Sequence, residues 1–319
     1  MTDRRHVLAL CGGVGGAKLA AGLAAVLPPE RLTIVVNTGD DFEHLGLSIS
    51  PDIDTVVYTL SGLSDEARGW GVADESWQAL SMLGRLGEAD WFRLGDRDLA
   101  MHIARTRRLR AGETLSQVTA ELARRLGVAP ALVPMSDDPV RTRLLTADGA
   151  LDFQRYFVAE QCRPVARGVS FAGAEAARLS PGFDAALSRA DLGGVIFCPS
   201  NPYLSIDPLL ALPGVRQRLQ ALRVPRVAVS PIIGGRAVKG PLAKMMAELG
   251  ASVNGVGVAR HYAGLIDRLM IDEADRAEAA AIEAVGVAVD VAPTMMRSHE
   301  DRRGLAKAAL AAAGMTEDA

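Results

Sequence analysis

Short apolar runs that stop at glycine or polar residues recur along the chain and predict a parallel β-sheet. The first run, His6 to Cys11, stops at Gly12, and a helical stretch from Ala17 to Val26 follows. A strand, a glycine turn, a helix and a second strand in this order are typical of a parallel sheet covered by helices. We therefore predict an α/β, Rossmann-like fold with mostly parallel strands, which include Leu32 to Val36, Leu192 to Cys198, Arg226 to Ser230, Ser252 to Val258, Arg268 to Ile271 and Val287 to Val291.

Between residues 64 and 128 the apolar residues recur at spacings of three and four, which indicates helices. We interpret this segment as a helical insertion within a single nucleotide-binding domain that spans residues 1–319. Asp98 is a suitable N-cap for the second of its helices. Beyond the insertion, Asp148-Gly149 separates two strand-like stretches and predicts a β-hairpin. The expected helices are Asp74 to Leu86, Asp98 to Leu109 and Leu115 to Leu126, and the hairpin arms are Thr142 to Thr146 and Ala150 to Val158.

Composition excludes several classes of protein. The chain is 49% apolar but only 4% aromatic, so its core must be built mainly from Ala, Val, Leu and Ile. A net charge of −3, from 35 basic and 38 acidic residues, argues against nucleic acid or a membrane surface as partner. The three scattered cysteines suit neither a disulfide framework nor a zinc site. Because the start is polar and no apolar run approaches the roughly 20 residues of a membrane span, we expect a cytoplasmic protein.

The first glycine-rich turn is the leading candidate for a phosphate site. Glycines after a strand leave backbone N–H groups open to a phosphate, and the following helix directs its positive end towards it. The pattern is neither a Walker A loop nor a complete dinucleotide fingerprint, so a tight turn with close helix–strand packing is the alternative. The candidate residues are Gly12, Gly13, Val14, Gly15, Gly16 and, one helical turn later, Lys18.

Two acidic segments follow the second predicted strand. They are Asn37-Thr38-Gly39-Asp40-Asp41 and Ser50-Pro51-Asp52-Ile53-Asp54. Carboxylates near strand ends can hold Mg²⁺, which takes one or two protein carboxylates together with phosphate oxygens. Asx turns and helix capping are the alternative explanation of these aspartates.

Three later segments also carry chemistry beyond ordinary turns. Arg93 and Arg97 flank a glycine before a predicted helix, and arginine forks suit phosphate recognition. The loops Cys198-Pro199-Ser200-Asn201-Pro202 and Ser230-Pro231-Ile232-Ile233-Gly234 each follow an apolar run. Ligands of open α/β sheets bind at the carboxyl ends of strands, so both loops are candidates for holding a nucleotide.

Taken in order, these motifs make the chain similar to a known family. The segments GGVGGAK, NTGDD, SPDIDT, RGWG, LGDRD, PMSDDP, PSNP and SPIIGG run from Gly12 to Gly235. This series resembles the 2-phospho-L-lactate transferase family of coenzyme F(420) biosynthesis, and the similarity continues through nearly the whole chain.

The resemblance implies a specific reaction. Such a protein transfers 2-phospholactate or phosphoenolpyruvate from a guanosine-diphosphate-linked donor to the deazaflavin Fo, releases GMP and requires Mg²⁺. By similarity, Asp54 and Arg93 would contact Fo and, with Asp41, form the catalytic group, while Asp41 and Asp54 would ligate the metal. The nucleotide would be held by the glycine turn, Lys18, Ser200, Asn201, Ser230, Pro231 and Gly234. A homodimer is also implied.

Two other functions stay open on the sequence alone. An NAD-dependent oxidoreductase would use an acidic residue about 20 positions after the glycine turn, a distance that Asp40 and Asp41 nearly match. That reaction leaves the later Ser, Pro and Asn loops without a task. A regulatory protein of the same superfamily would bind a nucleotide or sugar nucleotide, but the LGDRD and PMSDDP segments resemble the transferase branch. The transferred acid, whether lactyl, enolpyruvyl or glyceryl, stays undetermined.

Overall fold

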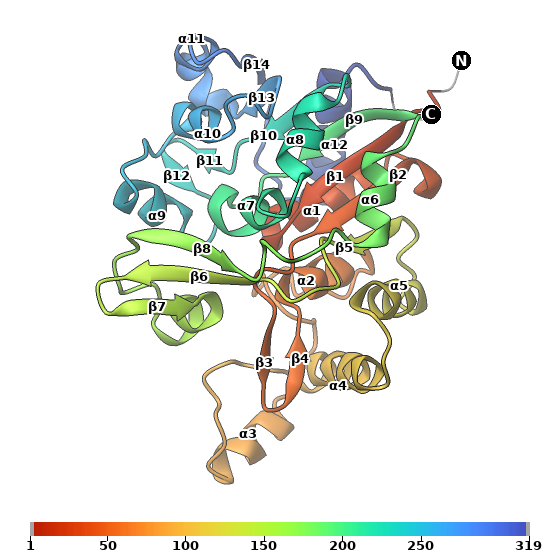
Figure 1. Ribbon diagram of the computed structural model, residues 1–319, viewed down its shortest axis with the longest axis vertical. Helices are drawn as coiled ribbons and strands as arrows, with labels where there is room; N and C mark the ends of the chain where they lie inside the picture. Colours follow the sequence, from red (N-terminus) through yellow and green to blue (C-terminus); the bar gives the residue numbers. More distant parts are fainter. Residues whose placement is uncertain (1–2, 317–319) are drawn as a thin grey trace.

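The computed structural model describes residues 3–316 and centres on a seven-stranded parallel sheet. The strand order is β14-β13-β10-β9-β1-β2-β5, and every neighbouring pair runs parallel (Figure 1). The predicted Rossmann-like α/β fold is therefore confirmed. The strands are β1 (His6–Cys11), β2 (Leu32–Val36), β5 (Ala131–Pro134), β9 (Leu192–Phe197), β10 (Arg226–Val229), β13 (Arg268–Ile271) and β14 (Ala288–Val291).

Helices cover both faces of this sheet, which explains why its central strands are apolar throughout. In β1 alternate residues point to opposite faces, as the two-residue period of a strand requires. Val7 and Ala9 pack towards α1, α2, α5 and α12, whereas Leu8 and Leu10 pack towards α6 to α11. The bounds are α1 (Gly13–Ala24), α2 (Pro51–Leu60), α5 (Leu115–Arg125), α6 (Pro181–Leu187), α7 (Asp207–Leu210), α8 (Val215–Ala221), α9 (Leu242–Glu248), α10 (Gly255–His261), α11 (Ala279–Glu283) and α12 (His299–Ala312).

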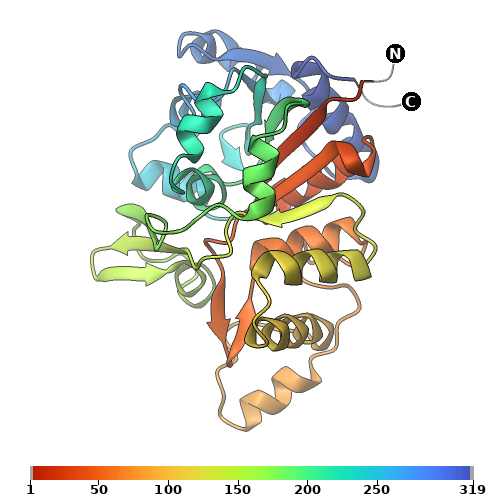
Figure 2. The same ribbon diagram turned by 45° about the vertical axis from the view of Figure 1, so that its right-hand side comes forward.

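Smaller elements extend from the main sheet. The hairpin of β3 (Phe42–His44) and β4 (Leu47–Ile49), together with α3 (Gln78–Arg85) and α4 (Asp96–Arg110), lies away from it at the bottom of Figures 1 and 2. A three-stranded antiparallel sheet joins β6 (Arg141–Thr146), β7 (Gly149–Asp152) and β8 (Gly168–Ala172). The two-residue strands β11 (Ile232–Ile233) and β12 (Arg236–Ala237) form a hairpin, and the remaining short helical turns are Pro29–Arg31, Arg155–Ala159, Pro202–Ile206 and Glu273–Glu278.

The prediction of a strand from Ser252 to Val258 is wrong. Asn254 instead caps α10, because its side-chain oxygen accepts a hydrogen bond from the Gly257 amide at 2.9 Å. The valines at 253, 256 and 258 alternate well enough to suggest a strand, but the cap starts a helix at Gly255.

Two other expectations need adjustment, and one strand was not predicted. The hairpin around Asp148-Gly149 is present, but its second arm ends at Asp152 and the chain then turns into a π-helical segment. Helix α4 begins at Asp96 with Gly95 as N-cap, so Asp98 lies in its first turn and does not cap it. The edge strand β5 was not predicted, because its four residues end in proline and carry too short a pattern.

The packing of α1 against α12 generates a stability prediction. A Cβ atom on Gly22 of α1 would overlap the backbone carbonyl of Arg302 in α12. Because backbone atoms cannot move aside without shifting a whole helix, we expect Gly22→Ala to lower the free energy of unfolding by about 1–3 kcal/mol. Urea denaturation followed by circular dichroism measures this change.

Gly304 of α12 is the matched control. Nothing lies within 4 Å of a Cβ built on it, and it is exposed in the interior of the helix. Gly304→Ala should therefore stabilise the protein by roughly 0.5–1 kcal/mol, since alanine is the better helix former. Equal effects of the two substitutions would contradict the proposed helix contact.

Candidate functional site

The glycine segment after β1 is tied to two neighbouring loops by hydrogen bonds. The Gly12 amide donates to the Ser200 hydroxyl oxygen at 3.0 Å, and that hydroxyl donates to the Gly12 carbonyl at 2.8 Å. The Gly13 amide donates to Oδ1 of Asp52 at 2.9 Å, and Gly13 has a φ of +63°. Side chains at positions 12, 15 and 16 would collide with Asp52, Pro199 and Ser200, respectively. The glycines are therefore needed for close packing of the turn, which was the alternative interpretation of this motif in the sequence analysis.

This packing leaves two amides open. Val14 and Gly15 occupy the first turn of α1, where N–H groups have no acceptor within the helix. No other residue between 3 and 316 accepts a hydrogen bond from them. Because the positive end of α1 lies at the same place, an anion can bind there.

Three buried aspartates lie between the end of β2 and the first turn of α2, namely Asp40, Asp41 and Asp52. Asp52 accepts hydrogen bonds from the Gly13 amide and from Nδ2 of Asn37, the latter at 2.9 Å. Asp41 Oδ2 accepts one from the Ser50 hydroxyl at 2.8 Å. In contrast, Asp40 Oδ1 and Asp41 Oδ1 are buried without a hydrogen-bond partner among the described residues.

Burial dominates the electrostatics of these carboxyl groups. It raises the pKa of Asp41 to about 7 and the pKa of Asp52 to about 6. Burial also raises the pKa of Asp40 well above its usual value, and the negative charge of Asp52 adds to this effect. The charges of Arg141 and Arg105 offset only part of this effect at Asp41, so a bound cation would further favour the ionised state of the cluster.

Asp54 lies in a different environment although it is only two residues from Asp52. Both of its carboxylate oxygens contact the guanidinium of Arg105 from α4, one of them at 3.0 Å. His102 Nδ1 lies 3.6 Å from Asp54 Oδ2 and 3.2 Å from Arg105 Nη1. Asp54 and Arg105 are only 4% and 2% exposed, so the pair is shielded from water.

Another carboxylate, that of Asp98, lies on the face of α4 that carries His102 and Arg105. Asp98 Oδ1 lies 3.2 Å from Nε2 of His102 and accepts a hydrogen bond from the Tyr58 hydroxyl at 2.6 Å. Donor atoms of Asp54, Asp98 and His102 all lie within 4.8 Å of one another, a spacing that also suits a metal ion. Since Arg105 already supplies a positive charge to Asp54, the unpartnered oxygens of Asp40 and Asp41 are the better cation site.

Several predicted nucleotide contacts make local hydrogen bonds in this structure. The Asn201 side-chain oxygen accepts from the amides of Tyr203 and Leu204 and so caps a helical turn. The Ser230 hydroxyl donates a hydrogen bond to the Ile232 carbonyl and accepts one from the Ile232 amide, and Pro231 between these two residues is buried. The Gly234 amide donates to Asp275 at 2.9 Å. These loops are built by such contacts, whereas the open amides belong to Val14 and Gly15.

Arg93 is exposed and belongs to an aromatic cluster apart from Asp54. Its guanidinium lies 4.6 Å from the centroid of the Trp77 ring. Arg68 lies 5.0 Å from the rings of both Trp70 and Trp77, so cations and indoles alternate here. Within residues 3–316 no hydrogen bond or ion pair joins Arg93 to Asp54.

Lys18 does not contact the amides of the glycine turn. Its ammonium donates to the Met296 carbonyl at 2.9 Å and lines a cavity of about 190 Å³ that begins at Val14.

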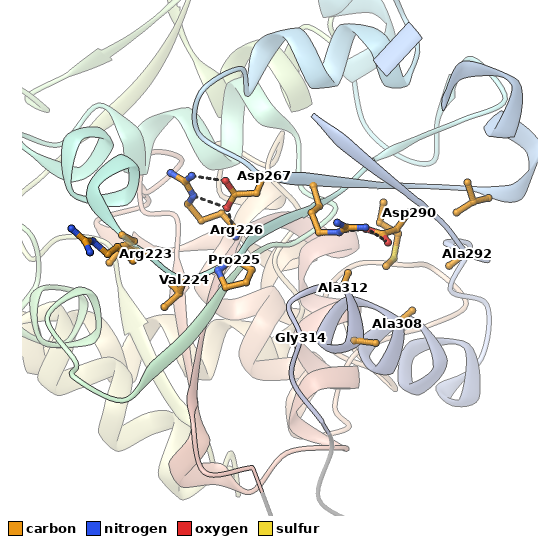
Figure 3. A pocket seen from close by; sticks show the side chains of 15 residues that line it. Arg223, Val224, Pro225, Arg226, Asp267, Asp290, Ala292, Ala308, Ala312 and Gly314 are labelled. Atoms are coloured by element: carbon orange, nitrogen blue, oxygen red, sulfur yellow. Dashed lines mark hydrogen bonds and ion pairs between the residues drawn. The ribbon is translucent and has the colours of Figure 1, made fainter. Parts of the chain in front are cut away.

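A larger hollow of about 1020 Å³ lies beside α12, away from these residues. Two ion pairs line it: Arg226 with Asp267, which Figure 3 shows, and Arg268 with Asp290, with N–O distances of 2.6 and 2.7 Å. The rest of its lining includes alanines of α12. The remaining charged side chain of its lining, Arg223, is exposed, and the hollow lies apart from the glycine turn and the buried aspartates, so size alone does not make it a reaction site.

The sequence analysis identified neither Arg105 nor His102 as a site residue. The signal was present, because positions 98, 102 and 105 lie on one face of a helix at spacings of four and three. What the spacing did not reveal was that this face would meet α2. No helix among residues 3–316 has the length and apolar character to cross a bilayer.

Comparisons with known proteins identify the family of the chain. Residues 7–303 match the family model described as 2-phospho-L-lactate transferase CofD. A phosphoenolpyruvate transferase of Kitasatospora aureofaciens is 42% identical over 315 residues, covering 97% of this chain and 98% of the relative. A 2-phospho-L-lactate transferase of Methanosarcina mazei is 40% identical over 296 residues, covering 93% and 96%.

Solved structures support the fold. A crystal structure of a UPF0052 family member from Bacillus halodurans matches with a TM-score of 0.63 at 13% sequence identity and covers 97% of this chain and 100% of that one. At such low identity this match concerns the fold alone. On the strength of the sequence relatives and the family model, the chain belongs to the 2-phospho-L-lactate transferase CofD family.

Proposed function

We propose that this transferase moves 2-phospholactate or phosphoenolpyruvate from a guanosine-diphosphate-linked donor to the deazaflavin Fo and releases GMP. Family membership and relatives named for both acids support the reaction class. The observation that carries the proposal is one juxtaposition at the sheet edge. The open amides of Val14 and Gly15 directly follow Gly13, which is hydrogen-bonded to Asp52, and the charge of Asp52 acts on Asp40. Together with the unpaired oxygens of Asp40 and Asp41, this arrangement suits a nucleotide diphosphate and a divalent cation.

The carboxylates fit Mg²⁺ as the implied cofactor. Asp40 and Asp41 each offer a buried oxygen without a partner, and hard oxygen ligands are what Mg²⁺ prefers. When bound, the ion would neutralise negative charge on the phosphate oxygens during transfer. Asp54, which the sequence also proposed as a ligand, has both oxygens on Arg105 and is therefore assigned to positioning the acceptor side.

The protein's own groups contribute mainly position and charge, as expected for phosphoryl transfer. The amides of Val14 and Gly15 would hold phosphate oxygens of the nucleotide. The Asp54–Arg105 pair fixes the start of α2 against α4 and thereby sets the wall on which the acceptor binds. Arg93, stacked on Trp77, presents an exposed cation and an aromatic surface that suit a deazaflavin ring.

The two alternative functions have less support. An NAD-dependent oxidoreductase has less support because relatives about 40% identical over nearly the whole chain are named as transferases. A regulatory nucleotide-binding role has less support for the same reason, since a shared fold at 13% identity carries no information on function.

Mass spectrometry of the reaction products tests the proposed function. The purified protein, supplied with Fo, Mg²⁺ and each guanylated acid in turn, should yield Fo enlarged by the phosphorylated acid, together with GMP. The preferred acid is then identified by the faster reaction. Absence of product with every donor would overturn the proposed function.

Two site variants should behave differently in that assay. Asp54→Asn leaves Arg105 buried without its counter-charge, so we expect loss of turnover together with a fall of about 3–5 kcal/mol in unfolding free energy.

Arg93→Ala removes an exposed side chain, so stability should stay within about 0.5 kcal/mol while the KM for Fo rises. Asp152→Asn, in an exposed ion pair on β7, is the control for both. An unchanged KM for Fo in Arg93→Ala would remove Arg93 from the acceptor site.

Magnesium binding should depend on both Asp41 and pH. Because Asp41 has a pKa of about 7 in the folded protein, it is mostly protonated at pH 5.5 and ionised at pH 8. Ligands must lose their protons to bind a metal, so calorimetry should show tighter Mg²⁺ binding at pH 8. Asp41→Asn should weaken binding at least about tenfold at pH 8, as expected when one charged ligand is lost. Equal binding at both pH values, or in the variant, would exclude Asp41 as a ligand.

A further inference from the structure

The cavity beside the glycine turn is small and lies at the carboxyl edge of the sheet. Its volume is about 190 Å³. Its walls come from α1, α2, the loop of residues 64–71, Lys239 and Arg302 of α12. Val14, whose amide is open, forms part of the wall, so the cavity adjoins the proposed phosphate position directly.

Most charged groups in this wall are paired with each other. Asp65 forms an ion pair with Arg68 at 2.8 Å, and Glu66 forms one with Arg302 at 2.5 Å. The two carboxylates of the wall are thereby neutralised.

Two lysines remain without a counter-charge. Lys18 donates to the Met296 carbonyl at 2.9 Å, and Lys239 donates to the Gly69 carbonyl at 2.7 Å. In the described part of the chain no carboxylate forms an ion pair with either ammonium. The cavity thus holds two positive charges in excess of its negative ones. The chain has only four lysines, Lys18, Lys239, Lys244 and Lys307, and half of them meet here.

This arrangement is electrostatically unfavourable when the cavity holds only water. Burial lowers the pKa of Lys18, and the charge of Arg302 lowers it further, whereas Glu66 raises it without reversing the shift. Burial also lowers the pKa of Lys239, and the charge of Lys18 adds to the effect. In addition, Nη1 of Arg68 is buried without a hydrogen-bond partner. An anion between these groups would relieve repulsion and satisfy open donors.

We propose that this cavity binds the carboxylate of the three-carbon acid being transferred, with Lys18 and Lys239 as its two cationic contacts. The assignment rests on the proposed function and names a subsite within it. A phosphate held by the amides of Val14 and Gly15 would place the attached acid at the mouth of the cavity. Lys239 also spans from the segment after β12 to the 64–71 loop, so the subsite closes across two loops.

The size of the cavity selects among the proposed substrates. Drug-sized ligands occupy pockets of roughly 300–1,000 Å³, so a cavity of about 190 Å³ is too small for a guanosine or a tricyclic deazaflavin. A three-carbon acid is of suitable size. Lys18, which the sequence assigned to the nucleotide, is accordingly reassigned to the acid.

Competitive acetylation of the lysines, read by peptide mass spectrometry, tests the subsite on the intact protein. GMP with phosphoenolpyruvate reproduces the two halves of a donor, and GMP alone is the reference. We expect phosphoenolpyruvate to slow acetylation of Lys18 and Lys239 by at least about fivefold, since a bound ion pair shields the amine. Lys244, which is paired with Glu248, and Lys307 of α12 are controls in the same spectrum and should not change.

Three results would overturn the proposal. They are no protection of Lys18 and Lys239, equal protection by inorganic phosphate with GMP, and protection by Fo instead of the acid. The second would make the cavity a plain phosphate site, and the third would assign it to the acceptor.

Kinetics separate this inference from the proposed function. Lys18→Met and Lys239→Met should each raise the KM for the guanylated donor about tenfold and leave the KM for Fo unchanged, with Lys307→Met as control. If the wild-type protein forms no product, the proposed function fails while the acetylation result still reports on the subsite. If it forms product and both variants keep the wild-type KM for the donor, the subsite alone is wrong.

Discussion

The close approach of three loops at one sheet edge is the constraint on which the rest of this structure depends. The Ser200 hydroxyl and the Asp52 carboxylate fasten the backbone of Gly12 and Gly13, and no side chain larger than hydrogen fits at positions 12, 15 and 16. Because Gly12 and Gly13 are held in this way, α1 starts in a fixed direction and leaves the next amides open. The proposed anion site would therefore arise from packing, with no dedicated side chain.

Electrostatic asymmetry around this edge separates the roles of its carboxylates. Asp54 is matched by a buried guanidinium, so its charge is compensated within the protein. Asp40 and Asp41 have no such partner, and burial raises the pKa of both. An unmatched buried charge is costly, which makes this cluster a place where an external cation would stabilise the fold as well as the substrate. Lys18 and Lys239 are positive charges without a carboxylate partner in the described chain. One edge of the sheet therefore carries a group suited to bind a cation and another suited to bind an anion.

Helix α4 connects the segment outside the main sheet to this chemistry. Its residues Asp98, His102 and Arg105 lie one above another and meet Tyr58 and Asp54 of α2. A helix outside the main sheet thus helps to hold α2 in place. The first turn of α2 in turn supplies Asp52 to the glycine segment. Residues that contact no phosphate can in this way control the geometry of the phosphate site.

The sequence by itself determined the fold class, most strands of the sheet and the family, because apolar periodicity and ordered motifs are local signals. It also indicated the glycine turn and the acidic segments as site components. Only the tertiary structure decided which charges are compensated. It placed Arg105 on Asp54, left one oxygen each of Asp40 and Asp41 without a partner, and brought Lys239 to the same cavity as Lys18, 221 positions earlier in the chain. The physical reason is that the charge state and availability of a side chain depend on burial and on neighbours from distant segments. No local pattern of residues contains that information.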